Sequence, residues 1–236
     1  ETDAQACDDN TGPLLDHMST VDTARDMDAL RSALGLETVD YLGFSYGTYL
    51  GTVFSSLYPD SVDRLVLDSV VDPDTPWYES NLNQSRALDR AARNFFDWVA
   101  RHDDTFGLGG SGEDVARAYD RLRDQLRDEP LEGTVGPTEL ENLAITVSYS
   151  GNAWPRVAGA LSDQIVDEDP AALAQLDDDL GEGPDNDQSR GGYNAVQCTD
   201  SHWPTDRGIW EGEGHRAHQE APFIGWNNIW SVSYTH

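Results

Sequence analysis

Hydrophobic residues recur at helical spacing in the first forty residues of the chain. Ser19 or Thr20 precedes them as an N-cap, Asp22 places negative charge in the first turn, and Gly35 follows as a stop signal. This pattern predicts a helix over residues 20–34, with an apolar face formed by Val21, Ala24, Met27, Leu30 and Leu34.

Two short apolar runs flank a second apolar helix. The first run, residues 39–42, leads directly into Gly43, and the second covers residues 65–71. The segment between them has small residues on one side and large apolar residues on the other, and Pro59 ends it. The order of strand, helix and strand predicts a βαβ unit with a right-handed crossover in a parallel sheet.

From Trp77 onward the apolar positions follow helical periods. They predict helices over residues 80–103 and 112–128, one beginning at Pro137, and one over 154–166. The acidic stretch 177–192 is predicted as an exposed loop and the aromatic stretch 193–204 as irregular. A boundary near Asp72 therefore divides the chain into residues 1–72, which contain the sheet, and residues 73–236, which are mostly helical.

The composition narrows the class of partner. Hydrophobic residues make up 38% of the 236, enough for a folded core, and the formal net charge of −29 disfavours nucleic acid and anionic membranes as partners. No stretch approaches the about 20 apolar residues of a membrane span. Cys7 and Cys198 can pair with each other, stay reduced, or bond to partners outside the sequence, so they do not identify a compartment.

The candidate chemistry lies at the end of the first predicted strand. Residues 43–47 read Gly-Phe-Ser-Tyr-Gly and match Gly-x-Ser-x-Gly, with an apolar strand before them and an apolar helix after them. Such a turn exposes the hydroxyl of Ser45 and directs the backbone N–H of Tyr46 at the oxyanion that forms after nucleophilic attack. An incidental Gly–Ser turn is the alternative, but the flanking elements favour a catalytic nucleophile.

Three segments give a more specific indication: residues 18–35, 41–73 and 193–204. They resemble the secreted tripeptidyl aminopeptidases of actinobacteria, which are serine peptidases of the α/β-hydrolase fold related to prolyl aminopeptidases. The resemblance implies that Ser45 is the nucleophile and that the Tyr46 amide is an oxyanion donor. It also implies that residues 73–236 form a helical cap, that the substrates are peptides with free N-termini, and that the protein is secreted.

The sequence departs from that family in three respects. No glycine-rich loop for a second oxyanion donor precedes Ser45, and neither the acid nor the histidine of a triad is identifiable. Histidines occupy six positions, and none follows an apolar strand in a Gly–His turn: His17, His102, His202, His215, His218 and His236. His215 and His218 are expected on a surface helix, where neither a catalytic base nor a metal site is favoured.

The sheet is also short for this fold. An α/β-hydrolase has about eight strands, and two are predicted here. We therefore expect the 236 residues to be an internal part of a longer polypeptide or one piece of a split enzyme. The other strands, the triad acid and base, and the second oxyanion donor would then lie outside this sequence, in another chain if the enzyme is split.

An aminopeptidase also needs a carboxylate for the α-amine of its substrate. Asp200, in a segment that resembles the family, is the candidate, and a capping or solvated aspartate is the alternative. Trp203, Trp154 and Tyr193 can line a pocket or form cap core. No metal or organic cofactor is expected.

Two other functions remain open from the sequence. One is a different α/β-hydrolase activity, such as a prolyl aminopeptidase or an esterase, because pocket shape decides among them. The other is a non-catalytic chain that binds peptides or a partner, which the unidentified acid and base would favour.

Overall fold

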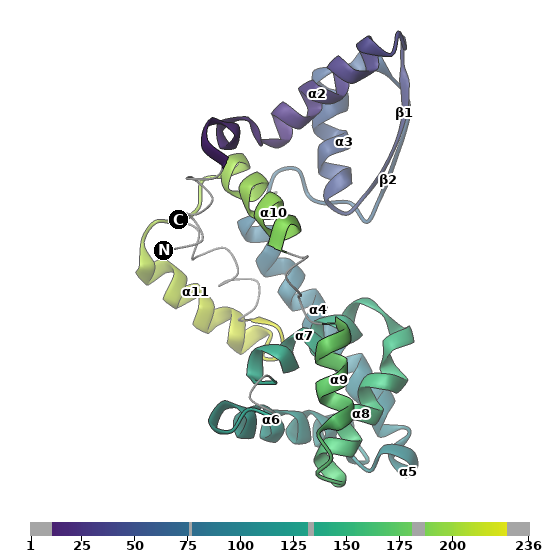
Figure 1. Cartoon of the computed structure of the whole chain (residues 1–236), viewed down its shortest axis with the longest axis vertical. Coiled ribbons are helices and arrows are strands. Elements are labelled where there is room, and N and C mark those ends of the chain that lie inside the picture. The colour runs from purple at the N-terminus through teal and green to yellow at the C-terminus, as the bar shows by residue number, and fades with distance from the viewer. Residues whose placement is uncertain (1–10, 76, 132–134, 181–186, 226–236) are drawn as a thin grey trace. The chain divides into compact units, whose positions relative to one another are not determined.

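The computed structural model describes residues 11–75, 77–131, 135–180 and 187–225 (Figure 1). They form two compact units. The first takes in 11–81 and 187–207 of the described residues, and the second takes in 82–180 and 208–225. Because residues 187–207 pack with the first unit, the units do not follow a single boundary at Asp72. The assignment of residues 73–236 as a cap stays a prediction.

The first unit contains the predicted βαβ arrangement. The elements that form it are α2 (Thr20–Ala33), β1 (Val39–Phe44), α3 (Tyr46–Leu57) and β2 (Val62–Asp68), with short 3₁₀ turns η1 (Gly12–His17) and η2 (Pro59–Ser61). The two strands are parallel, with Tyr41 opposite Leu65 and Phe44 opposite Asp68. The predicted order of elements is confirmed, although β2 begins and ends three residues earlier than the apolar run suggested.

One face of the two-stranded sheet is covered by α3, as Figure 1 shows. On its other face, Leu42, Phe44 and Val66 are 61%, 58% and 55% exposed within the described structure. Apolar strands of a parallel sheet are normally covered on both faces. Within the described residues, the second face of this parallel sheet is therefore uncovered.

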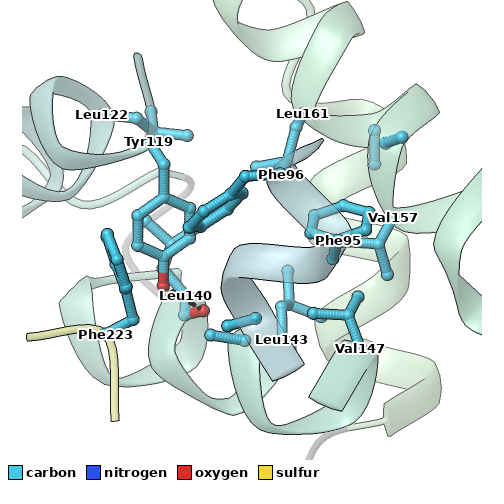
Figure 2. Close-up of a cluster of buried hydrophobic side chains, with 14 of the residues drawn as sticks. Phe95, Phe96, Tyr119, Leu122, Leu140, Leu143, Val147, Val157, Leu161 and Phe223 are labelled. Carbon is cyan, nitrogen blue, oxygen red and sulfur yellow. Dashed lines mark hydrogen bonds between the residues drawn. The ribbon is translucent and has the colours of Figure 1, made fainter. Parts of the chain in front are cut away.

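The second unit is helical, as predicted. Its helices are most of α4 (Tyr78–Ala100), then α5 (Asp103–Phe106), α6 (Gly112–Asp128), α7 (Pro137–Tyr149), the 3₁₀ turn η3 (Gly151–Ala153), α8 (Trp154–Val166), α9 (Ala171–Leu180) and α11 (Arg207–Glu220). Figure 2 shows the buried cluster at which α4, α6, α7 and α8 meet. In this cluster, the Phe96 and Phe223 rings meet edge-on with their centroids 4.9 Å apart. The Tyr119 hydroxyl donates a hydrogen bond to the Leu140 carbonyl at 2.8 Å.

The predictions for residues 177–204 were partly wrong. Residues 177–180 belong to α9, and α10 (Asp187–Asp200) is a helix that includes much of the stretch predicted as irregular; residues 181–186 lie outside the described structure. Gly191 and Gly192 lower the helix propensity of this segment, but Ala195 and Gln197 are buried. Tertiary burial of these two positions therefore outweighs the weak local preference.

Burial of a carboxylate on α7 makes the stability of the second unit dependent on pH. Burial raises the pKa of Glu141 from 4.5 to about 7, with Arg123 opposing the shift. Because the pKa is raised in the folded state, the protonated Glu141 side chain contributes fully to folding stability below pH 4.5. This contribution is lost as the pH rises through about 7. In the wild type, we expect the free energy of unfolding to fall by about 1–3 kcal/mol over this interval. In Glu141→Gln, we expect no such fall. Denaturant unfolding from pH 4 to 8 measures it, and parallel curves for variant and wild type would contradict the prediction.

Candidate active site

Ser45 occupies the turn between β1 and α3. Its backbone has φ 52° and ψ −123°, a conformation that non-glycine residues rarely adopt and that costs about 1–3 kcal/mol. The Ser45 N–H donates to the Asp68 carbonyl at 3.1 Å, which fixes the turn against the end of β2. The side chain is exposed, and no group in the described residues hydrogen-bonds its hydroxyl. The sharp turn thus presents a serine hydroxyl at the carboxyl end of the strand.

Close packing of α3 on the strands requires glycine at two positions. A Cβ at Gly43 would lie 2.4 Å from the Gly47 carbonyl oxygen, and one at Gly51 would lie 2.4 Å from Tyr41 Cε1. Gly47 differs, because its nearest neighbour would be the Tyr41 hydroxyl at 3.7 Å. Of the two motif glycines, the described structure therefore requires only Gly43 for packing.

Thr48 joins the turn to the chain that follows β2. Its hydroxyl donates to the Ser45 carbonyl at 2.6 Å and accepts from the Val71 N–H at 2.9 Å, and the residue is fully buried. Sequence reasoning did not select Thr48. The available signal was a threonine three residues after the serine, on a helix whose other buried positions are apolar or glycine.

Tyr46 is the first residue of α3. The first N–H groups of a helix have no intrahelical acceptor. Within the described structure, no other group accepts a hydrogen bond from the Tyr46 N–H. The positive end of the helix dipole favours an anion there. Both properties suit an oxyanion donor, the role predicted for this amide.

The Tyr46 side chain is held at its ring and at its hydroxyl. The ring stacks on Trp77 with centroids 5.5 Å apart and an interplanar angle of 26°. The hydroxyl is 2.7 Å from Thr20 Oγ1. Burial raises the pKa of Tyr46 above its ordinary value, and the charge of Asp200 adds to this. The phenol therefore stays protonated.

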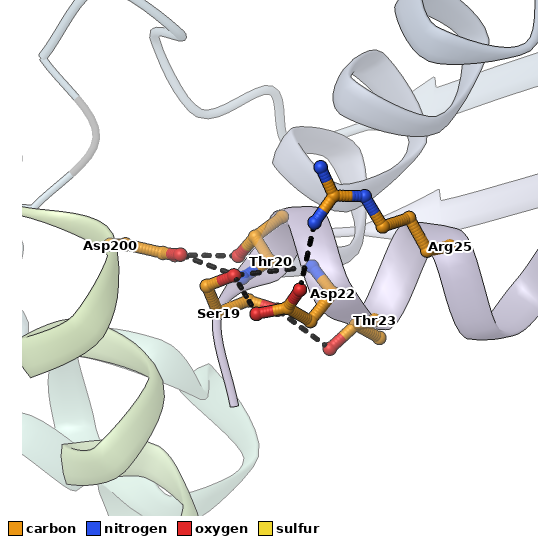
Figure 3. A network of polar contacts seen from close by, with 6 residues as sticks. All are labelled: Ser19, Thr20, Asp22, Thr23, Arg25 and Asp200. Atoms are coloured by element: carbon orange, nitrogen blue, oxygen red, sulfur yellow. Dashed lines mark hydrogen bonds and ion pairs between the residues drawn. The ribbon is translucent and has the colours of Figure 1, made fainter. Parts of the chain in front are cut away.

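Asp200, at the end of α10, lies at the start of α2 (Figure 3). Its Oδ1 accepts from the Thr20 N–H at 2.7 Å, and its Oδ2 accepts from the Thr20 hydroxyl at 2.5 Å and from Trp77 Nε1 at 3.1 Å. The carboxylate thus caps α2 from a segment 180 residues away in sequence. Its predicted role as amine anchor stays a prediction.

In the described residues, no histidine hydrogen-bonds the Ser45 hydroxyl. His202 is exposed after α10, His215 and His218 lie on α11 in the second unit, and His236 and Cys7 lie outside the described structure. The described residues contain no group of three or more side chains that could hold a metal ion. Nor does any described helix have the length and apolar character needed to cross a membrane.

The candidate pocket aromatics have different surroundings. Trp154 Nε1 donates to the Val147 carbonyl at 2.8 Å and packs against the core of the second unit. Trp203 is buried and donates to the Gln197 carbonyl at 2.9 Å. Tyr193 is 50% exposed and meets Trp77 edge-on.

Comparison with known proteins shows which sequences this chain resembles. Residues 2–110 match the family model described as the alpha/beta hydrolase fold. The tripeptidyl aminopeptidases of Streptomyces lividans and Streptomyces coelicolor are each 38% identical to this chain, over an alignment of 232 positions that covers 96% of the chain. In sequence, the chain is therefore similar to tripeptidyl aminopeptidases, and its first half is similar to the alpha/beta hydrolase fold. The serine protease Hip1 of Mycobacterium tuberculosis is a more distant relative, 29% identical over 94% of the chain.

The chain spans less than half the length of the curated relatives it matches. It covers 43% of each Streptomyces protein and 45% of Hip1. The coverage agrees with the expectation that the family's remaining elements lie outside these 236 residues.

Proposed function

We propose that this chain carries the nucleophile of a serine peptidase that removes short peptides, tripeptides or similar units, from free N-termini. The observation that carries the proposal is the exposed Ser45 hydroxyl on a strained strand-to-helix turn, next to a Tyr46 N–H that no described residue accepts. The names of the tripeptidyl aminopeptidase relatives support the substrate class. Their resemblance also supports secretion as the location of this protein.

The reaction proceeds through an acyl-enzyme. A general base removes the proton from Ser45 Oγ, which attacks the scissile carbonyl, and the oxyanion accepts a hydrogen bond from the Tyr46 N–H. Collapse of the tetrahedral intermediate breaks the C–N bond, and the base returns its proton to the leaving amine. Water then hydrolyses the ester, releases the N-terminal fragment and regenerates Ser45. In this proposal the base, its acid partner and the second oxyanion donor are groups outside the described residues.

Asp200 is the proposed anchor for the substrate's α-amine. A carboxylate has about four acceptor positions, and the structure fills three of those of Asp200 with donors from Thr20 and Trp77. The remaining position suits one N–H of an ammonium group. A fixed anchor of this kind would set how many residues are released.

Paired peptide substrates test the exopeptidase assignment in the protein as its host produces it. We expect a tripeptide nitroanilide with a free N-terminus to be cleaved at least about 100-fold faster than its N-acetylated form, because acetylation removes the charge that a carboxylate binds. Mass spectrometry of a longer peptide's products gives the length released. Equal cleavage of both forms, or hydrolysis confined to esters, would overturn the assignment and favour another α/β-hydrolase activity.

A further inference from the structure

Thr20 is the centre of a buried polar network in the first unit. It is 1% exposed, and both its N–H and its hydroxyl donate to the carboxylate of Asp200, as Figure 3 shows. The same hydroxyl oxygen lies 2.7 Å from the Tyr46 hydroxyl. Thr20 therefore connects the residue after the proposed nucleophile to a carboxylate on α10.

The chemistry of the three groups gives this network one direction. An ionised carboxylate only accepts hydrogen bonds, and a threonine hydroxyl has one proton. That proton goes to Asp200 Oδ2, so the Tyr46 hydroxyl must donate to Thr20. Trp77 Nε1 also donates to Oδ2, while the Trp77 ring stacks on Tyr46. The hydroxyl and one ring face of Tyr46 are thus both fixed by groups bound to Asp200.

A side chain fixed at two points restricts its own backbone. The strained turn at Ser45 persists only where surrounding contacts determine it, and Tyr46 is the next residue. An oxyanion donor must also point at the place where charge develops in the transition state. Contacts to the Tyr46 side chain can therefore hold the adjacent N–H in a productive direction.

We infer that Asp200 and Thr20 are positioning residues that orient Tyr46 and, through it, the backbone N–H at the oxyanion site. Asp200 then acts on acyl transfer itself, in addition to any contact with the substrate's amine. The inference rests on the proposed function, since it assigns these residues to the chemistry at Ser45.

Capping of α2 by Asp200 is the purely structural alternative. Capping uses only the Thr20 N–H and the carboxylate, so it does not require the Tyr46 hydroxyl. Variants at Thr20 and Tyr46 that leave the Thr20 N–H in place therefore separate positioning from capping.

The first experiment compares Tyr46→Phe and Thr20→Val with Thr20→Ser in the protein as its host produces it. The readouts are the rate of fluorophosphonate labelling at Ser45, and kcat and KM for a small activated ester that has no amine. We expect Tyr46→Phe and Thr20→Val to lower the labelling rate and kcat about 10- to 100-fold with little change in KM, because the donor is misaligned. Thr20→Ser keeps the hydroxyl and should stay within about threefold of wild type. Asp26→Asn, an exposed carboxylate on α2, is the matched control.

Asp200→Asn separates positioning from amine binding. If Asp200 is a positioning residue, Asp200→Asn should lower kcat for the ester and for the free peptide alike. An increase in KM confined to peptides with free N-termini would overturn the inference and leave Asp200 as an anchor only. Wild-type labelling rates in Thr20→Val and Tyr46→Phe would likewise overturn it. No labelling of Ser45 in the wild type would instead overturn the proposed function.

Discussion

Ser45→Ala is expected to abolish peptide hydrolysis, with kcat falling by about 10³–10⁶-fold in the protein as its host produces it. The physical reason is that the acyl-enzyme cannot form without the hydroxyl oxygen, so only binding and oxyanion stabilisation remain. Steady-state kinetics on a free tripeptide nitroanilide measure the loss. Fluorophosphonate treatment followed by mass spectrometry should give one adduct at Ser45 in the wild type and none in the variant.

Ser69 provides a matched control for this experiment. It is also exposed, follows the end of β2, and has a positive φ of 60°. It does not open a helix, and its hydroxyl faces the Asp68 carboxylate at 3.3 Å. Ser69→Ala should therefore retain wild-type activity and labelling. Loss of activity in Ser69→Ala with retention in Ser45→Ala would contradict the assignment of the nucleophile.

The turn at Ser45 was predictable because the residues that form it are close together in the sequence. The glycines, the apolar strand and the apolar helix that make the turn lie between residues 39 and 59, so motif and periodicity describe the same short segment. The left-handed backbone of Ser45 agrees with this context. Fold class followed from the same segment, with the resemblance of neighbouring stretches adding the family.

The surroundings of Asp200 were not predictable, because they depend on long-range contacts. Its partners Thr20 and Trp77 lie 180 and 123 positions away, and no local pattern encodes such pairs. The same reason explains the error over α10, where burial of Ala195 and Gln197 outweighs two glycines. Asp200 could be selected as a candidate from its segment's resemblance, but neither Thr20 nor the direction of the network could.

The two glycines of the motif are expected to differ in their tolerance of a methyl group. At Gly43 an added Cβ would meet the Gly47 carbonyl oxygen at 2.4 Å and its carbonyl carbon at 2.6 Å. These are backbone atoms of α3, so the conflict cannot be relieved by rotating a side chain. We expect Gly43→Ala to shift α3 and to lower the stability of the first unit by about 1–3 kcal/mol, as overpacking does. Since α3 begins at Tyr46, the same shift should slow labelling of Ser45 by about 100-fold.

Gly47→Ala is the matched substitution within the same five residues. Among the described residues outside its own helix, only the Tyr41 hydroxyl would lie near this Cβ, at 3.7 Å. Alanine also favours a helix over glycine by about 1 kcal/mol. Denaturant unfolding should therefore show Gly47→Ala as stable as wild type or more stable, and Gly43→Ala as destabilised. Equal destabilisation by the two substitutions would mean that the strand–helix packing at Gly43 does not hold the turn at Ser45. A stable Gly47→Ala protein with slow labelling would instead place a group from outside the described residues against that glycine, at the side of the turn where the oxyanion forms.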